Sequence, residues 1–238
     1  MSRPTHLAQI RRELDRFDGG IVVSCQAGPG NPLYGLESMV RMARAAELGG
    51  ARAIRANGPL DCSAIIAATN LPLIAINRIR LPGHPVHTTP TRKSALQVLA
   101  TGAKAIGLDA TSRPRPGGET LRDVVGTVHN GGAIALGDLG SMRDLEGALA
   151  ADVDAVGTTL SAGTSNSAGD EPDFDFLALL VKHSPVPVFA QGRYWTPDQA
   201  RQAFALGALF VVVGNAITNP MAITSRFVKA SPAADDRS

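Results

Sequence analysis

Two apolar segments near the C-terminus end abruptly at a glycine that is followed by a polar residue. Residues 185–193 read PVPVFAQGR, and residues 208–215 read ALFVVVGN. Backbone N–H groups can reach an anion only where no side chain blocks the approach, and glycine leaves that approach open. The candidate phosphate-binding residues are Gly192, Arg193, Gly214 and Asn215. If the two segments are neighbouring parallel strands, this pattern indicates binding of a phosphorylated small molecule.

A scaffold must bring these strand ends to one rim. Short apolar segments alternate with longer amphipathic ones, which is typical of a parallel sheet covered by helices. We predict strands at residues 20–24, 52–55, 73–76, 103–108, 133–136, 155–157, 187–190 and 209–213. The helices are clearest at residues 36–48, 92–100, 121–129, 142–150, 174–182 and 197–205. Eight such units predict an α/β protein with a (β/α)8 TIM barrel of the phosphate-binding type. The competing open doubly wound sheet is disfavoured because no GxGxxG follows the first strand.

The length and composition fit one barrel. Such barrels commonly have about 250 residues, and this chain has 238, of which 44% are hydrophobic. No domain-sized linker or low-complexity stretch interrupts the chain, so we predict a single domain over residues 1–238. The final polar segment, residues 230–238, is predicted to be a disordered tail.

Charge and composition argue against nucleic acid and membranes as partners. The chain has 23 basic and 21 acidic residues, a net charge of +2, without a block of like charge, and only 4% aromatic residues. A polyanion-binding surface or a base-stacking platform is therefore not expected. No apolar run approaches the roughly 18 residues of a membrane helix, and the first residues show no secretory signal. Cys25 and Cys62 have no metal-ligand spacing, so we expect reduced thiols and a cytoplasmic location.

Polar residues follow every predicted strand, at the end where barrels of this type carry their function. They are Ser24, Gln26, Arg55, Asn57, Asn77, Arg78, Arg80, Asp109, Thr111, Asp138, Thr158, Thr159, Ser161, Gln191, Arg193 and Asn215. Any one of them could be only a helix cap or a loop hydrogen bond. Eight strand ends converging on one rim favour a binding site. Arg55 and Arg193 have the strongest individual claims, because an arginine beside an apolar strand is costly to desolvate without an anionic partner.

Two loops and the histidines leave alternatives open. Residues 108–119 (LDATSRPRPGGE) contain two Arg-Pro steps and form either a rim that carries arginines or a stiff connector. Residues 158–170 (TTLSAGTSNSAGD) either close over a sugar phosphate or form a mobile loop. His84 and His87 lie in the third strand–helix loop. No histidine spacing suggests a metal site, so none is predicted.

Six segments resemble, in order and spacing, the N-acetylmannosamine-6-phosphate 2-epimerase family over about residues 20–228. They are IVVSCQA (21–27), AIRA (53–56), LDATSRPRP (108–116), VGTTLS (156–161), GRYWTP (192–197) and VVGNAIT (212–218). The resemblance implies an isomerase of bacterial sialic acid and amino-sugar breakdown that needs no cofactor or metal. It implies a small amino-sugar phosphate as substrate. A homodimer is common for this type of barrel.

Matching positions imply roles for individual residues. Gln26, Arg55 and Asp138 would contact the sugar and its N-acetyl group. The candidate phosphate-binding residues would line the phosphate end. Three further residues of the rim complete the predicted substrate-binding set: Asp109, Thr159 and Ser161.

This chain departs from the family at the catalytic positions. The family has a catalytic lysine just after the third strand and a catalytic glutamate before the Gly-Arg pair of the seventh, where this chain has Arg78 and Gln191. A family arginine before a proline after the eighth strand is replaced by Asn219. Epimerisation next to a carbonyl needs a group that removes and returns a proton. Arginine stays protonated and glutamine does not titrate, so the predicted catalytic set of Arg78, Gln191 and Asp138 is altered.

Three hypotheses follow. The first is a 2-epimerase whose proton transfer uses Asp138, Asp109, His84 or His87. The second is a non-catalytic sugar-phosphate binder in which Arg78 holds an additional anion. The third is an isomerase or lyase for a related phosphosugar, since one barrel fold supports many reactions.

Overall fold

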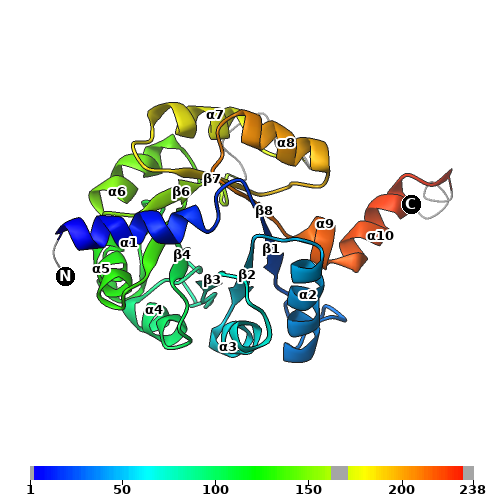
Figure 1. Ribbon diagram of the computed structural model, residues 1–238, viewed down its shortest axis with the longest axis horizontal. Helices are drawn as coiled ribbons and strands as arrows, with labels where there is room; N and C mark the ends of the chain where they lie inside the picture. The colour runs from blue at the N-terminus through cyan, green and yellow to red at the C-terminus, as the bar shows by residue number, and fades with distance from the viewer. Residues whose placement is uncertain (1–2, 162–170, 233–238) are drawn as a thin grey trace.

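The barrel is closed and entirely parallel. The computed structural model describes residues 3–161 and 171–232 of the chain, and within them the strands pair in chain order from β1 to β8, with β8 returning to β1 (Figure 1). The strands are β1 (Ile21–Cys25), β2 (Ala53–Asn57), β3 (Leu73–Ile76), β4 (Ala105–Asp109), β5 (Ile134–Asp138), β6 (Ala155–Gly157), β7 (Val188–Gln191) and β8 (Val211–Val213). This confirms the predicted (β/α)8 TIM barrel.

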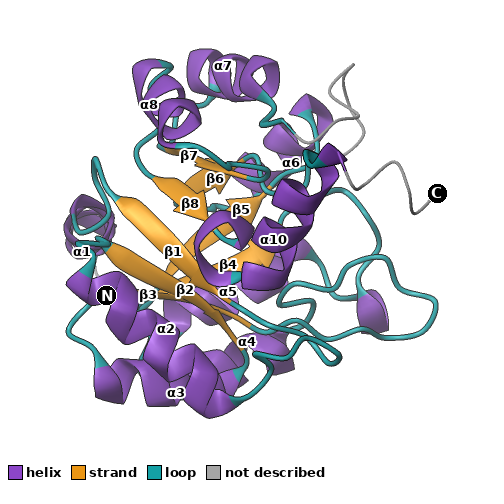
Figure 2. Cartoon of the chain, turned by 90° about the vertical axis from the view of Figure 1, so that its right-hand side faces the viewer, coloured by secondary structure: helices purple, strands orange, loops and turns teal. Residues whose placement is uncertain are grey.

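Helices cover the outside of the barrel (Figure 2). They are α1 (Arg3–Asp15), α2 (Leu36–Leu48), α3 (Pro59–Ala68), α4 (Arg92–Leu99), α5 (Leu121–Asn130), α6 (Leu145–Ala150), α7 (Phe174–His183), α8 (Pro197–Ala205), α9 (Asn215–Thr218) and α10 (Pro220–Lys229). Short 3-10 turns precede α5 (Pro116–Gly118) and α6 (Met142–Asp144). Side-chain caps from Thr91, Thr120 and Thr196 start α4, α5 and α8. The sequence predicted six of these helices to within a few residues.

Helices α1 and α3 were not among the helices predicted from the sequence, and each has a physical reason for lacking a clear sequence signal. Helix α3 (PLDCSAIIAA) is apolar on most sides, so it lacks the 3.6-residue alternation that identifies an amphipathic helix. Helix α1 precedes the first strand and lies across the N-terminal end of the barrel in both views (Figures 1 and 2). There Leu14 and Phe17 pack into the barrel interior.

Alternation along the strands divides the barrel interior into an apolar floor and a polar mouth. The floor contains Val22, Ala53, Ile74, Ala105, Ile134, Phe189 and Phe210. The Phe189 and Phe210 rings stack with centroids 5.0 Å apart. Since strand side chains alternate between two faces, residues two or four positions after a floor residue in the same strand also point into the barrel. Arg55, Asp138 and Gln191 occupy such positions. The inward register of the floor residues therefore determines that these polar side chains face the mouth.

Some predictions lie outside the described residues. These are residues 162–170 of the hydroxyl-rich loop and residues 233–238 of the predicted tail. In the described part of the chain, no helix combines the length and the apolar character needed to cross a membrane.

Candidate functional site at the C-terminal rim

A buried ion pair occupies the centre of the barrel mouth. Arg55 at β2 donates from Nη1 to Asp138 Oδ1 (3.1 Å) and from Nη2 to Asp138 Oδ2 (2.5 Å), across 83 residues of sequence. The side chains of Arg55 and Asp138 are 1% and 0% exposed. A fully buried ion pair is tolerated only where good geometry offsets its desolvation penalty. The bidentate contact between Arg55 and Asp138 provides such geometry. The Arg55 Nε is buried without a hydrogen-bond partner in the described residues.

A glycine makes room for this ion pair. A Cβ placed on Gly107, inside β4, would lie 2.8 Å from Ile76 Cγ2 and 3.3 Å from Arg55 Nη2. A side chain at this position would clash with Ile76 and crowd the guanidinium that binds Asp138. We did not predict Gly107 as a site residue; its signal was a lone glycine inside an apolar strand, which often marks such a close approach.

Two further strand ends complete a network around the pair. Gln191 Oε1 accepts a hydrogen bond from Arg55 Nη1 (2.7 Å), and Thr159 Oγ1 donates to Asp138 Oδ1 (2.7 Å). The Thr158 hydroxyl donates to Gln191 O (2.9 Å) and accepts from Gln191 N (3.1 Å). The structure therefore brings together four of the predicted site residues, from β2, β5, the loop after β6, and β7. We call Arg55, Asp138, Thr159 and Gln191 the mouth network.

Arg78 lies beside this network. Its backbone pairs with Thr88 in an antiparallel bridge, and its N–H donates to Asn57 Oδ1 (2.7 Å). Burial lowers the pKa of Arg78, the like charge of Arg55 lowers it further, and Asp138 partly offsets this shift. The charges of Arg55 and Asp138 at the mouth therefore both act on Arg78. The residue is exposed to solvent, and its guanidinium forms no hydrogen bond or ion pair with another described side chain.

The glycines after β7 and β8 have the backbone geometry of an anion site. Gly192 and Arg193 both have positive φ angles, 114° and 61°, and Gly214 immediately precedes the short helix α9. Within the described residues, the backbone N–H groups of Gly192, Arg193, Gly214 and Asn215 donate no hydrogen bond. Unpaired amides can receive an anion, so the turns after β7 and β8 both meet this requirement of the predicted phosphate site. Positive φ angles occur only in the turn after β7, because Gly214 has a φ of −111°.

The polar side chains at this end bond to residues of neighbouring loops and helices. Arg193 donates from Nε to Glu171 O (2.5 Å) and from Nη2 to Ser161 Oγ (3.3 Å), which links the loops after β6 and β7. Asn215 Oδ1 accepts from Asn219 Nδ2 (3.1 Å). Asn219 also caps α10 by accepting from Ala222 N (3.1 Å). The backbone amides of Arg193 and Asn215 are thus open to a phosphate, while the Arg193 side chain is partly engaged by the neighbouring loop.

Asp109 organises the loop after β4. Its carboxylate accepts from Thr111 N (3.0 Å), Thr111 Oγ1 (2.6 Å) and Arg113 Nη2 (2.6 Å). The buried Arg115 donates to Pro90 O (3.2 Å) and to Asp109 O. These contacts favour the stiff-connector interpretation of residues 108–119.

The other predicted residues lie around the mouth network without joining it. Gln26 Nε2 donates to Ser24 Oγ (2.7 Å) at the end of β1. His87 Nδ1 is buried without a partner among the described residues, and no hydrogen bond links it to the mouth network. In the described residues, no three His, Cys, Asp or Glu side chains are close enough to hold a metal.

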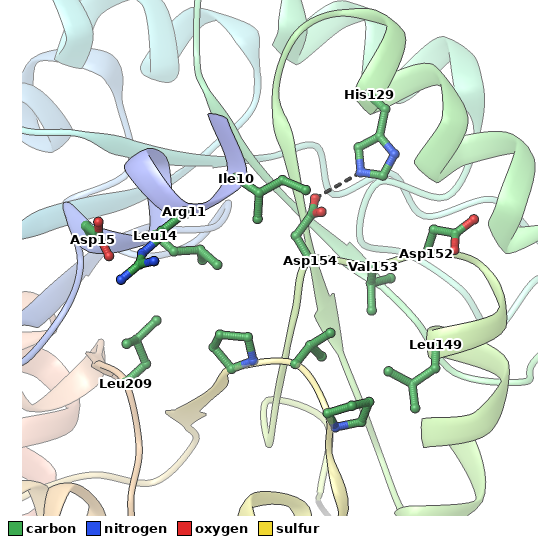
Figure 3. Close-up of a pocket in the computed structure, with 13 residues that line it drawn as sticks. Ile10, Arg11, Leu14, Asp15, His129, Leu149, Asp152, Val153, Asp154 and Leu209 are labelled. Carbon is green, nitrogen blue, oxygen red and sulfur yellow. Dashed lines mark hydrogen bonds and ion pairs between the residues drawn. The ribbon is translucent and has the colours of Figure 1, made fainter. Parts of the chain in front are cut away.

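A separate cavity of about 900 Å³ lies at the opposite end of the barrel (Figure 3). Residues from α1 and from the segments that enter β6, β7 and β8 line it, including Leu14, Asp154 and Leu209. His129 Nε2 lies 2.9 Å from Asp154 Oδ2 at its edge. Because this cavity faces the barrel floor, it is not the site predicted from the strand ends.

Comparisons with known proteins agree with this geometry. The model of the N-acetylmannosamine-6-phosphate epimerase family matches residues 39–233. A relative from Clostridium perfringens, named as an N-acetylmannosamine-6-phosphate 2-epimerase, is 41% identical over 215 residues, covering 90% of this chain and 97% of its own. A relative from Enterobacter sp. with the same name is 41% identical over 226 residues, covering 93% and 96%.

Solved structures give the same result. The N-acetylmannosamine-6-phosphate 2-epimerase from Clostridium perfringens superposes with a TM-score of 0.88 at 41% identity, covering 92% of this chain and 96% of that one. A thiamine phosphate pyrophosphorylase from Pyrococcus furiosus, at 15% identity and a TM-score of 0.58, shares the fold and covers 89% and 92%. With a matching family model, 41% identical relatives and a superposable barrel, this chain belongs to the N-acetylmannosamine-6-phosphate 2-epimerase family.

Proposed function

We propose that this protein binds N-acetylmannosamine 6-phosphate and N-acetylglucosamine 6-phosphate and interconverts them by proton transfer at C2, without a cofactor. The observation that carries this proposal is the mouth network on the same rim as the open amides of Gly192 and Gly214. The amides would hold the phosphate. The mouth network would hold the sugar, with Gln26 and Thr159 offering further polar contacts.

The proton-transfer step is the weak part of this mechanism. Arg78 and Gln191 occupy the positions of the family lysine and glutamate, and both can hold and polarise a substrate carbonyl by donating hydrogen bonds. Neither is an efficient base near neutral pH. Both Asp138 oxygens already accept bonds from Arg55, and Oδ1 also accepts from Thr159. We therefore expect slow epimerisation; a barrel that binds sugar phosphates without catalysis is the alternative that Arg78 and Gln191 favour.

Hydrogen exchange at C2 separates the two functions. The purified protein is incubated in D2O with N-acetylmannosamine 6-phosphate, and mass spectrometry follows deuterium at C2. Incorporation above the protein-free rate, with formation of the C2 epimer, supports the epimerase. Tight binding in calorimetry without exchange supports the binding protein, and the absence of both rejects the proposed site.

Gly192→Ala is expected to weaken binding of the sugar phosphate at least tenfold. Alanine is strained at a φ of 114°, so the chain would relax and turn the Gly192 amide away from the phosphate. Isothermal titration calorimetry measures the loss. Gly50→Ala is the matched control, because Gly50 also has a positive φ (85°) but lies before β2, at the opposite end of the barrel. Equal affinity losses in both variants would contradict the phosphate assignment.

We further propose a homodimer that buries α10. This helix has no buried residue and projects from the barrel beside α9 (Figure 1). Phe227 and Met221 are 76% and 55% exposed, an apolar surface that a second copy could cover. Sedimentation velocity is expected to show a dimer that Phe227→Glu converts to a monomer. Leu48→Glu, at a 90% exposed leucine on α2, should leave the dimer intact; a monomeric parent chain would reject the proposal.

The cytoplasmic location also stays a prediction. It is supported by two free, buried cysteines, Cys25 and Cys62, in a chain whose family works on a metabolite phosphate.

A further inference from the structure

The hydrogen-bond ladder between β3 and β4 ends before the mouth. Its last pair is Ala75 with Ile106, although β4 continues to pair with β5 as far as Asp109. In a parallel ladder the bonds repeat evenly along the strands. The next two bonds would therefore run from Asn77 N to Gly107 O and from Asp109 N to Asn77 O. Both donors bond to other atoms instead, so the two strands separate here.

Thr88 and Thr89 lie between the separated strands. The chain after β3 turns back on itself and returns to the barrel through an antiparallel bridge at Thr88. The Thr89 hydroxyl accepts from Asn77 N (3.1 Å) and donates to Gly107 O (2.7 Å). Thr89 N donates to Asn77 O (2.9 Å), and Asp109 N donates to Thr88 O (2.9 Å). One side-chain hydroxyl thus joins the donor and the acceptor that a continued ladder would have paired directly.

Thr89 has a backbone conformation that threonine rarely adopts. Its φ is 47°, and the residue is 0% exposed. A positive φ is a genuine outlier for a β-branched residue. Such conformations cost free energy and persist only where the surrounding structure determines them, which is often at a functional site. Glycine would fit this backbone without strain, but it has no hydroxyl to join β3 to β4. The two bonds of the hydroxyl therefore account for a threonine at this position.

The acceptor of this hydroxyl is the glycine beside the buried ion pair. A Cβ on Gly107 would lie 3.3 Å from Arg55 Nη2, so the Gly107 backbone is next to the guanidinium. Arg55 in turn donates to Asp138 and Gln191. A shift of β4 at Gly107 would therefore change the space available to Arg55 and the geometry of the mouth network. Thr89 ties β4 at that point through a buried hydrogen bond.

We infer that Thr89 is a positioning residue for the sugar end of the site: its hydroxyl holds β4 at Gly107 and thereby keeps Arg55 within the mouth network. The inference rests on the proposed function, in which the mouth network holds the sugar. The backbone amides proposed to hold the phosphate follow β7 and β8, which pair with neither β3 nor β4. Loss of the hydroxyl should therefore weaken contacts to the sugar and leave contacts to the phosphate intact.

Two ligands and two substitutions test this separation. Thr89→Val removes the hydroxyl and keeps the branched shape. We expect calorimetry to show at least tenfold weaker binding of N-acetylmannosamine 6-phosphate by this variant, whereas ³¹P NMR titration should show less than a twofold change in the affinity for inorganic phosphate. Thr89→Ser restores the hydroxyl and should bind the sugar phosphate within threefold of the parent chain.

A neighbouring threonine is the matched control. Thr91 caps α4 by accepting from Ser94 N (3.1 Å), so Thr91→Val also removes a hydroxyl with a structural bond, and it should keep the parent affinity for both ligands. Thr89→Gly lacks the hydroxyl but fits the positive φ without strain. It should lose sugar-phosphate affinity as Thr89→Val does, and it decides the test if Thr89→Val does not fold.

The outcomes are distinct. Parent-like binding of the sugar phosphate by the variants without the hydroxyl overturns the inference. Equal losses for the sugar phosphate and for inorganic phosphate also overturn it, because the hydroxyl would then support the barrel as a whole. Both results leave the proposed function standing. If the parent chain binds neither ligand, the proposed function itself is wrong, and the inference that rests on it is overturned as well.

Discussion

The double variant Arg78→Lys with Gln191→Glu is expected to exchange the C2 hydrogen of N-acetylmannosamine 6-phosphate at least a hundredfold faster than the parent chain. A positioned acid–base group typically contributes 10²–10⁴-fold. The parent has a guanidinium and an amide where the family has groups that titrate. The double variant restores both, within a mouth network that the structure already holds in place.

The environment of position 78 also predicts the pH dependence of that gain. Burial and the like charge of Arg55 lower the pKa of Arg78, and the same causes would lower a lysine pKa from its usual value of about 10.4. Lowering the pKa of a cation increases the neutral fraction at a given pH. The exchange rate of the double variant should therefore rise with pH and level off below the usual lysine pKa.

Variants with one substitution, and a variant with the lysine at the neighbouring position 80, test whether Arg78 and Gln191 limit the exchange rate. Arg78→Lys alone and Gln191→Glu alone should each gain less than the double variant, because proton removal and return need both groups. Arg80→Lys combined with Gln191→Glu places the lysine two residues away and should not reproduce the gain. A double variant that exchanges no faster than the parent would show that the two departures do not limit the chemistry.

Strand positions were predictable from the sequence because a buried parallel strand needs a continuous apolar run. The ends of β1, β3 and β6 fell within a residue of the predicted bounds. Alternation then links the fold to the site: Ile74 belongs to the apolar floor, and Ile76, two positions further on, lies beside Gly107 near Arg55. The sequence therefore places the polar rim residues at the same end of the barrel, and their roles in a site stay a prediction.

The partners within that group could not be read from the sequence. Arg55 and Asp138 meet across the barrel, and no local spacing encodes a contact between positions 83 residues apart. The same holds for Gly107, whose role is visible only once Arg55 crosses β4. Asp109 looked equivalent to Asp138 as a polar residue after a strand, yet its contacts are local, with Thr111 and Arg113. Long-range pairing decides which rim residues form the network.

Asp138→Ala should show how strongly the site is built into the fold. Removing one partner of a buried ion pair leaves an uncompensated charge, which typically costs about 3–5 kcal/mol, and Arg55 is only 1% exposed. Urea denaturation should report a loss of that size. Arg122→Gln, which breaks an exposed pair with Asp152, should change the unfolding free energy by no more than about 1 kcal/mol.

A second variant separates stability from binding. Arg55→Met combined with Asp138→Leu removes both charges and replaces them with apolar side chains, an exchange that is often neutral or stabilising in protein interiors. We expect it to recover most of the stability lost in Asp138→Ala while binding of N-acetylmannosamine 6-phosphate remains at least a hundredfold weaker than in the parent. If the double variant bound the sugar phosphate normally, the ion pair would be a structural element of the barrel and the sugar would have to be held elsewhere on the rim. If it stayed as unstable as Asp138→Ala, packing around Gly107 rather than the unpaired charge would account for the loss.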